Sequence, residues 1–378
     1  MKKCFFIAVG FLISGVVMFI SCSKSSSGPD KETGDFDKTA MLTYYADSII
    51  IPGYTTLQQK INALQTAIDA FTTAPSSSTQ LSVKMAYEGA HTQYVRMEPF
   101  NFGPAGTALL DVYVNFTGGL DYNFNTAGEL TGFSIDSVTI ENNIASGTYN
   151  LTTYSRNSFY SQGFPALNYL LFGPNAIAKF NTNTANRVKY VKDIVARLKT
   201  LFDKVASDWI TYHPGFIVNT QTNIGSPIGN MINQLAYEMD ILKGPRIGWP
   251  LGKQSNGIQF PGKCEAYFAG FSIALAIENL NALKNIYTAN GSGKGFSDYL
   301  VALGKTSLNS DVLAQFDLTL TKLQAVVDPL SVRLAGSGAD IALINAAYIE
   351  IQKLLTLIKT DVASATAVQI TFMDNDGD

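Results

Sequence analysis

The sequence RVKYVKDIVARLKTLFDKVASDW, residues 187–209, decides the fold because its apolar residues recur with a helical period. In steps of three and four, the recurring residues are Val188, Val191, Val195, Leu198, Phe202, Val205 and Trp209. These steps place them on one stripe of an α-helix, which must be buried against other helices. Ile194 and Leu201 lie beside this stripe and widen it, as the core of a helical bundle requires.

The same spacing is present in three other segments, residues 57–71, 313–330 and 344–362. Further helices are expected at 38–50, 78–101, 135–145, 164–172, 226–243 and 263–288. Short β-like pieces stand at 112–116 and 133–135, and residues 368–372 alternate like a short strand or an extended tail. The chain is therefore predicted to be all-α, with short β-like pieces in its connecting loops.

Turn-forming residues divide the helical segments. Residues 102–162 are rich in Asn, Gly, Thr and Ser, and the helical pattern is interrupted again at 213–225 and 244–262. We place a domain boundary at the second interruption. Two helical domains, each resembling a four-helix bundle, are predicted: an N-terminal one at 36–215 and a C-terminal one at 216–378.

The N-terminus has the pattern of a bacterial lipoprotein leader. A cationic start at residues 1–3 precedes the apolar run 5–20, which is shorter than the roughly 20 residues a membrane-spanning helix needs. Ser21 and Cys22 close it with a small residue before a cysteine. This predicts a signal peptide at 1–21, a lipid (palmitate-type) anchor on Cys22 and a flexible tether at 22–35. An uncleaved signal anchor is the alternative interpretation.

The predicted leader places the protein in the bacterial cell envelope, attached to the outer membrane with a periplasmic or a surface face. The whole chain has 27 basic and 30 acidic residues, and the leader contains two of the basic ones, so the mature chain carries a net charge of −5. A mildly acidic chain without a cationic stretch argues against a nucleic-acid partner. After removal of Cys4 and lipidation of Cys22, Cys264 remains alone, which excludes an internal disulfide.

Few residues have the pattern of a metal or catalytic site. His91 and His213 are the only histidines in the sequence. Glu88 and His91 stand three residues apart on a predicted helix, and Glu98 returns to the same face seven residues later. Di-metal bundles need two such pairs and further carboxylates, so a polar surface or interface cluster is the favoured interpretation.

Other chemical motifs are incomplete. The C-terminal DNDGD, residues 374–378, resembles the first half of a calcium loop but stops before the glutamate that such a loop needs. The sequence has no Gly-x-Ser-x-Gly motif and no phosphate-binding glycine loop. No catalytic residue is therefore assigned.

Short segments along the chain resemble the imelysin family of bacterial envelope proteins. In chain order they are DF (35–36), ML (41–42), IIPGY (50–54), YVRME (94–98), FNFGP (100–104), GFPALNYLLFG (163–173), IGWPLG (247–252), EAYFAGFS (265–272), NL (279–280) and ITFMDNDGD (370–378). The resemblance implies an all-helical fold of two bundle-like domains, a functional site between them and an association with iron acquisition. Some members of the family are described as peptidases.

The chain departs from the family at its Gly-x-His-x-x-Glu signature, whose histidine and glutamate are the presumed metal ligands. Gly163 is retained, but Pro165 and Asn168 stand at the ligand positions. Proline cannot ligate a metal, and an asparagine carbonyl is a weak, uncharged ligand. If iron or another divalent metal is bound, its ligands must come from the weak candidates Glu88, His91, Glu98 and Glu265.

We therefore expect a non-enzymatic binding lipoprotein, similar to imelysin-type iron-uptake proteins, with its ligand in a cleft between the two domains. The candidate cleft residues are Arg96, Glu98, Phe102, Gly163, Pro165, Asn168, Glu265 and Ser272. A metal, a glycan or a peptide would suit paired arginine and glutamate side chains. The first alternative is an interaction or scaffold lipoprotein that has lost the metal site and docks an envelope protein. A metal-dependent peptidase is a second, less favoured alternative.

Overall fold

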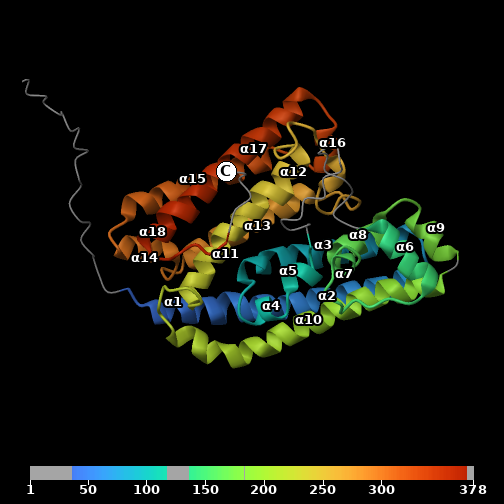
Figure 1. Ribbon diagram of the computed structural model, residues 1–378, viewed down its shortest axis with the longest axis horizontal. Coiled ribbons are helices and arrows are strands. Elements are labelled where there is room, and N and C mark those ends of the chain that lie inside the picture. The colour runs from blue at the N-terminus through green and yellow to red at the C-terminus, as the bar shows by residue number, and fades with distance from the viewer. Residues whose placement is uncertain (1–35, 117–135, 183, 373–378) are drawn as a thin grey trace, which may run out of the picture.

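The computed structural model describes residues 36–116, 136–182 and 184–372 of the protein. These residues form helices joined by turns and contain no strand, which confirms the all-α prediction (Figure 1). The leader, Cys22, the tether, the β-like piece at 133–135 and the calcium-loop-like residues 374–378 lie outside the described residues.

The first helices form the N-terminal group, blue to green in Figure 1. Helix α1 (Lys38–Tyr44) continues through a π-helical turn (Tyr45–Ile50) into α2 (Ile51–Thr73), and α3 (Ser77–Met97) follows. Helix α2 packs against both α3 and α10 (Ala185–Val218). The contact is apolar because the predicted stripe of α2 is buried along its whole length, at Leu57, Ile61, Leu64, Ile68 and Phe71.

Helix α10 contains the residues 187–209 that predicted the fold. Its stripe is buried from Val191 to Trp209, and only Val188 at the first turn is half-buried. The helix continues through Pro214 to Val218, beyond the predicted domain boundary.

Short helices connect α3 to α10. They are a 3₁₀ turn (Glu98–Phe100), α4 (Pro104–Thr107), α5 (Leu110–Tyr113), α6 (Ser137–Ser146), α7 (Arg156–Phe159), α8 (Gly163–Phe172) and α9 (Ala176–Asn181). The β-like prediction for 112–116 is wrong, because the amides of Tyr113 and Val114 bond to the carbonyls of Leu109 and Leu110. Residues 368–372 also form no strand, and the Thr371 amide donates to the Asn233 side chain instead.

The remaining helices form the C-terminal group, yellow to red in Figure 1. They are α11 (Pro227–Ile241), a π-helical segment (Leu242–Gly248), α12 (Trp249–Leu251), a 3₁₀ turn (Pro261–Lys263), α13 (Ser272–Thr288), a 3₁₀ turn (Ala289–Gly291), α14 (Phe296–Ala302), α15 (Thr306–Gln324), α16 (Leu330–Leu334), α17 (Gly338–Thr356), a π-helical turn (Leu357–Val362) and α18 (Ala363–Ala365). Helix α15 packs against α13 and α17, and α11 packs against α17.

Helix α13 begins at Ser272, whereas the sequence predicted a start near 263. Asp328, from the segment before α16, caps it by accepting hydrogen bonds from the amides of Ile273 and Ala274, each at 2.9 Å. The preceding residues turn instead, with positive φ angles of 49° at Ala266 and 77° at Gly270.

The two groups meet where α13 packs against α3 and α11 packs against the 3₁₀ turn Glu98–Phe100. Residues 219–226 connect the groups between the end of α10 and the start of α11. The assignment of 36–215 and 216–378 as separate four-helix-bundle domains stays a prediction. The interface between the groups is where the polar side chains described next are buried.

Candidate functional site

Arg246 lies at the centre of a buried charged cluster between the two groups. It stands in the π-helical segment after α11, beside Pro245, whose missing amide removes a helical hydrogen bond. The side chain of Arg246 is only 1% exposed. Its Nε donates to Glu265 Oε2 at 2.8 Å, its Nη2 donates to Glu98 Oε2, and its Nη1 lies 3.6 Å from Glu238 Oε2. We call these four residues the Arg246 cluster.

The three glutamates of the cluster come from different elements. Glu98 begins the 3₁₀ turn after α3, Glu238 lies on α11, and Glu265 lies in the turns before α13. Glu98 belongs to the N-terminal group and the other two to the C-terminal group. One guanidinium therefore links the two groups electrostatically.

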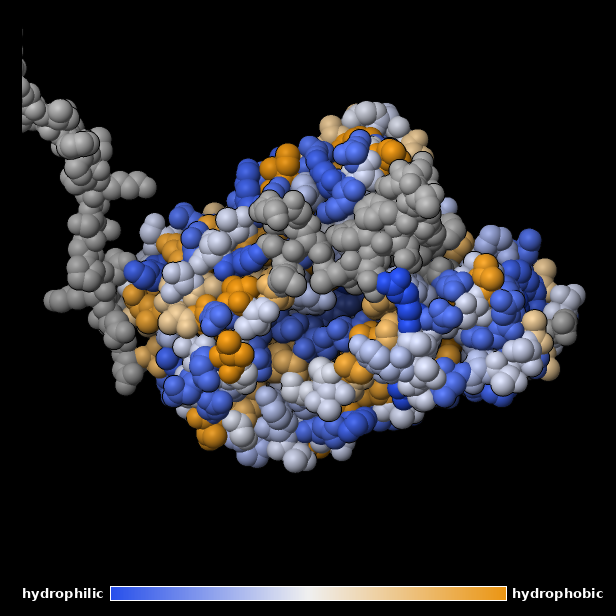
Figure 2. Space-filling view, viewed as in Figure 1, coloured by the Kyte–Doolittle hydropathy of each residue, from blue (hydrophilic) through white to orange (hydrophobic). Residues whose placement is uncertain are grey.

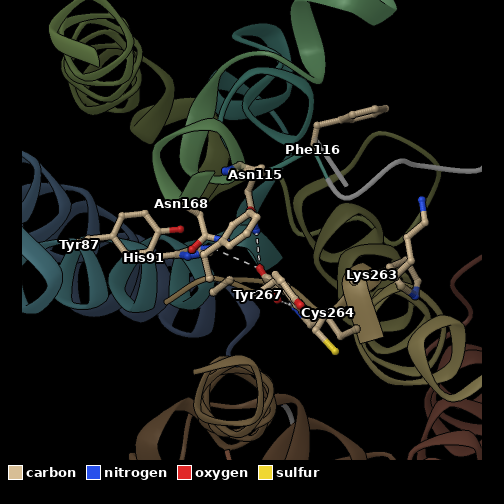
Figure 3. A pocket seen from close by; sticks show the side chains of 15 residues that line it. Tyr87, His91, Asn115, Phe116, Asn168, Lys263, Cys264 and Tyr267 are labelled. Atoms are coloured by element: carbon tan, nitrogen blue, oxygen red, sulfur yellow. Dashed lines mark hydrogen bonds and ion pairs between the residues drawn. The ribbon is translucent and has the colours of Figure 1, made fainter. Parts of the chain in front are cut away.

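Asn115 and His91 also contact the carboxylates of the cluster. Asn115 Nδ2 donates to Glu98 Oε1 at 2.9 Å and to Glu265 Oε1 at 2.8 Å. His91 Nε2 lies 3.2 Å from Glu265 Oε1, and the imidazole stacks on Phe164 with ring centroids 4.5 Å apart. In Figure 3 the dashed lines from His91 and Asn115 end on the same carboxylate, that of Glu265. The cluster thus has amide and imidazole partners on the N-terminal group's side.

Burial and neighbouring charges shift the pKa values of Glu238 and Glu265 in opposite directions. Burial, with the Glu98 carboxylate nearby, raises the pKa of Glu238 to about 8. Burial alone would also raise the pKa of Glu265, but Arg246 and His91 hold that pKa well below its usual range. Glu265 is therefore ionised at neutral pH, and Glu238 is mostly protonated.

Two cavities adjoin the cluster, and Asn115 and Arg246 line both of them. The His91 cavity has a volume of about 30 Å³, and its walls include Tyr87, Pro165, Asn168 and Cys264. The Asp111 cavity has a volume of about 100 Å³ and is walled by α5, α11 and the Glu98 turn. Figure 2 shows a hollow lined by hydrophilic residues between the two groups on the face where α5 and α11 lie.

Several residues predicted from the sequence meet here. Glu98 and Glu265 belong to the cluster, and Pro165 lines the His91 cavity. Asn168 also lines it, and its Oδ1 accepts a hydrogen bond from the Ala269 amide at 2.9 Å. Ser272 Oγ donates to the backbone carbonyl of Glu265. These last two contacts hold the turns that carry Glu265.

Gly163 positions the site through its backbone. It begins α8 with a φ of 71°, and a Cβ there would lie 2.2 Å from the carbonyl oxygen of Val114. The next amide, of Phe164, donates to that same carbonyl at 2.7 Å. Only glycine permits this approach, which places Asn115 beside the cluster.

Other predicted residues lie away from the cluster. Arg96 is half-exposed, pairs with Glu278 of α13 at 2.7 Å, and lines a separate groove of about 490 Å³. Phe102 packs against Trp209 and Phe216. Glu88 is half-buried on the outer side of α3, 3.8 Å from Lys84, and the structure gives it no contact with the buried His91.

Arg246, Glu238, Asn115 and Asp111 were missed by the sequence analysis. The one available signal for Arg246 was its position, a cation inside the otherwise apolar and turn-forming residues 244–251. Asn115 and Asp111 stand in a segment without helical periodicity, and nothing local distinguishes them.

The residues at the family's signature position do not fit a directly bound metal. Pro165 has no donor atom, and Asn168 Oδ1 already accepts the Ala269 amide. The oxygens of Glu98 and Glu265 bond to Arg246 and Asn115. In the part of the chain that the structure describes, no group of three His, Cys, Asp or Glu side chains could hold a metal ion. The guanidinium instead supplies the positive charge that these carboxylates require.

Fold and site together define an all-α protein in which two groups of helices enclose a buried polar cluster. A family model described as Imelysin matches residues 50–358, most of the chain. The chain belongs to the imelysin family, as the resemblance of its short segments predicted.

Two solved structures are similar to it. One, titled as a candidate iron-regulated protein A precursor from Parabacteroides distasonis, has a TM-score of 0.71 and 17% identity, covering 92% of this chain and 97% of that one. The other, an imelysin-like protein from Psychrobacter arcticum, has a TM-score of 0.68 and 18% identity, covering 89% and 97%. No curated protein matches the chain. At these identities the likeness shows the shared fold.

Proposed function

We propose that this chain is a non-enzymatic, lipid-anchored binding protein of the bacterial cell envelope that holds a small polar ligand beside the Arg246 cluster. One observation carries the proposal. Arg246 Nη1 and Asn115 Oδ1 are buried beside the cavities, and neither has a hydrogen-bond partner among the described residues. Buried polar atoms in folded proteins are almost always hydrogen-bonded, so a donor and an acceptor that both lack a hydrogen bond at one place support a ligand there.

The chemistry of the cluster supports binding over catalysis. Burial raises the pKa of the Cys264 thiol far above its ordinary value, which keeps it a weak nucleophile. Glu265 is tied to Arg246, and Glu238 is mostly protonated at neutral pH, so neither is a free general base.

The ligand classes to test follow from the donor and acceptor groups present. Sugars and peptide termini can pair with a guanidinium, an amide and carboxylates, whereas a free or chelated metal ion would be held by the amide oxygen and the carboxylates. Iron is included because one structural neighbour is titled as a candidate iron-regulated protein.

Binding in this cleft is expected to be lost when the cavity is filled. Ile241 lines the Asp111 cavity, so Ile241→Trp should weaken binding at least tenfold. Ile210→Trp, at a position on α10 that is 69% exposed, is the matched control and should bind like the wild type. The measurement is a thermal-shift and calorimetric titration of the full-length protein in mild detergent against the three ligand classes. If no class binds the wild type, or if both variants bind equally well, the proposed site is wrong.

The lipid anchor is tested separately. Cells fed an alkyne-tagged palmitate should label the wild type, and Cys22→Ser should lose the label and keep the mass of the precursor. Cys264→Ser is the control, because Cys264 is buried in the fold and should not affect labelling. Label that persists in Cys22→Ser would exclude this cysteine as the attachment site.

A further inference from the structure

The walls of the Asp111 cavity consist largely of oxygen-bearing side chains. They include the carboxyl groups of Glu98, Asp111 and Glu238 and the phenols of Tyr94 and Tyr237. Arg246 is the only cationic side chain among the described residues that line it, and it is shared with Glu265 outside the cavity. Around this cavity, oxygen-bearing side chains that can accept from or coordinate a cation therefore outnumber the single guanidinium.

Two asparagines leave acceptor oxygens free at this cavity. Both nitrogen-bound hydrogens of Asn115 are used by Glu98 and Glu265, so its amide orientation is determined, and its Oδ1 has no partner among the described residues. Asn115 is 5% exposed. Asn101 likewise bonds to the Asp111 carboxylate, and its buried Oδ1 is also left without a partner. Free carbonyl-type oxygens call for a hydrogen-bond donor or a cation.

The size of the cavity limits the occupant. A volume of about 100 Å³ has room for a few water molecules or a small hydrated ion. Hard cations such as Mg²⁺ and Ca²⁺ take oxygen ligands, and Mg²⁺ commonly keeps several waters between itself and the protein. A hydrated ion needs no preformed trio of direct ligands, in agreement with the arrangement of the described side chains.

We propose that the Asp111 cavity binds a small hydrated cation through the carboxylate of Asp111 and the free amide oxygens of Asn101 and Asn115, with the Glu98 carboxylate, already bonded to Arg246 and Asn115, lying beside them. The inference rests on the proposed binding function and names its ligand class. It assigns a cation position distinct from the signature residues Pro165 and Asn168, which line the His91 cavity. A metal ion and an organic ammonium group share this chemistry.

The test is calorimetric titration of chelator-treated, full-length protein in mild detergent at neutral pH. One arm uses Mg²⁺, Ca²⁺, Mn²⁺ and anaerobic Fe²⁺, and the other uses ethylammonium and putrescine. At least one cation should bind, and Asp111→Asn should weaken it at least tenfold. Asp111 is exposed at the rim of the cavity, so this isosteric change should disturb the fold little, and urea denaturation of the variant checks this. Asp317→Asn, at an exposed carboxylate that pairs with Lys284 on the C-terminal group, should change the affinity less than twofold.

Binding in the first titration series identifies a metal ion as the ligand, and binding in the second identifies an organic ammonium group. The proposed cation site is wrong if no cation binds the wild type, or if Asp111→Asn and Asp317→Asn bind it equally. If a sugar or a peptide then binds and Ile241→Trp blocks it, the binding function stands without the cation. If nothing binds in either experiment, both proposals fail.

Discussion

Replacing Arg246 with methionine is expected to lower the free energy of unfolding by about 3–5 kcal/mol, the usual cost of removing one partner from a buried ion pair. Methionine has a similar length but leaves Glu98 and Glu265 buried without their counter-charge. Urea denaturation of the wild type and the variant at pH 7 measures the difference.

The matched control is Arg96→Met, because Arg96 forms a single ion pair with Glu278 and its side chain is 49% exposed. Loss of this exposed ion pair should lower the free energy of unfolding by at most about 1 kcal/mol. A similar loss from both variants would show that the Arg246 cluster has no special role in stability.

The effect of Arg246→Met should also grow as the pH rises from about 5 to about 8. In the wild type the pKa of Glu265 is held low, so its contribution is fully present across this range. Without the guanidinium, burial raises the pKa of Glu265 in the folded state, and stability falls as the pH rises through the range. Removing the guanidinium also raises the pKa of Glu238, which is already about 8 in the wild type, so Glu238 adds to this loss of stability at higher pH. A difference that does not depend on pH would contradict this account.

Gly163→Ala is expected to lower the free energy of unfolding by about 3 kcal/mol. A positive φ costs a residue with a Cβ about 1–2 kcal/mol. The remainder comes from overlap, because the new Cβ would lie 2.2 Å from the Val114 carbonyl oxygen and the backbone must move. Since Asn115 follows Val114, this movement should also weaken ligand binding beside Arg246. Denaturation and the ligand titrations measure the two effects.

Gly215→Ala is the control for this substitution. Gly215 lies inside α10, and a Cβ there meets no other atom within 4 Å. Alanine should therefore stabilise the helix by about 0.5–1 kcal/mol through its higher propensity. If Gly163→Ala is as stable as Gly215→Ala, the close approach to Val114 does not constrain the site.

Local sequence predicted the long helices because their apolar stripes are a property of neighbouring residues. The stripes of α2 and α10 are buried as expected, and α6 and α8 lie within two residues of their predicted ranges. The predicted start of α13 was wrong because it depends on a residue that is distant in sequence: Asp328 caps the helix at Ile273 and Ala274.

The candidate site was predicted only in part. Family resemblance identified Glu98, Gly163, Asn168 and Glu265, because each lies in a short segment that can be recognised without its neighbours in space. It grouped Arg96 and Phe102 with them, although Arg96 faces a separate groove and Phe102 packs against α10. Membership of a recognised segment does not determine the direction of a side chain.

The sequence by itself determined an all-α chain of the imelysin family with an altered signature, because periodicity and short motifs are local properties. Only the tertiary structure placed Arg246 among Glu98, Glu238 and Glu265 and left two amide oxygens free beside them. The state of a buried charge depends on the sum of the groups around it, and here those groups come from segments far apart in the chain.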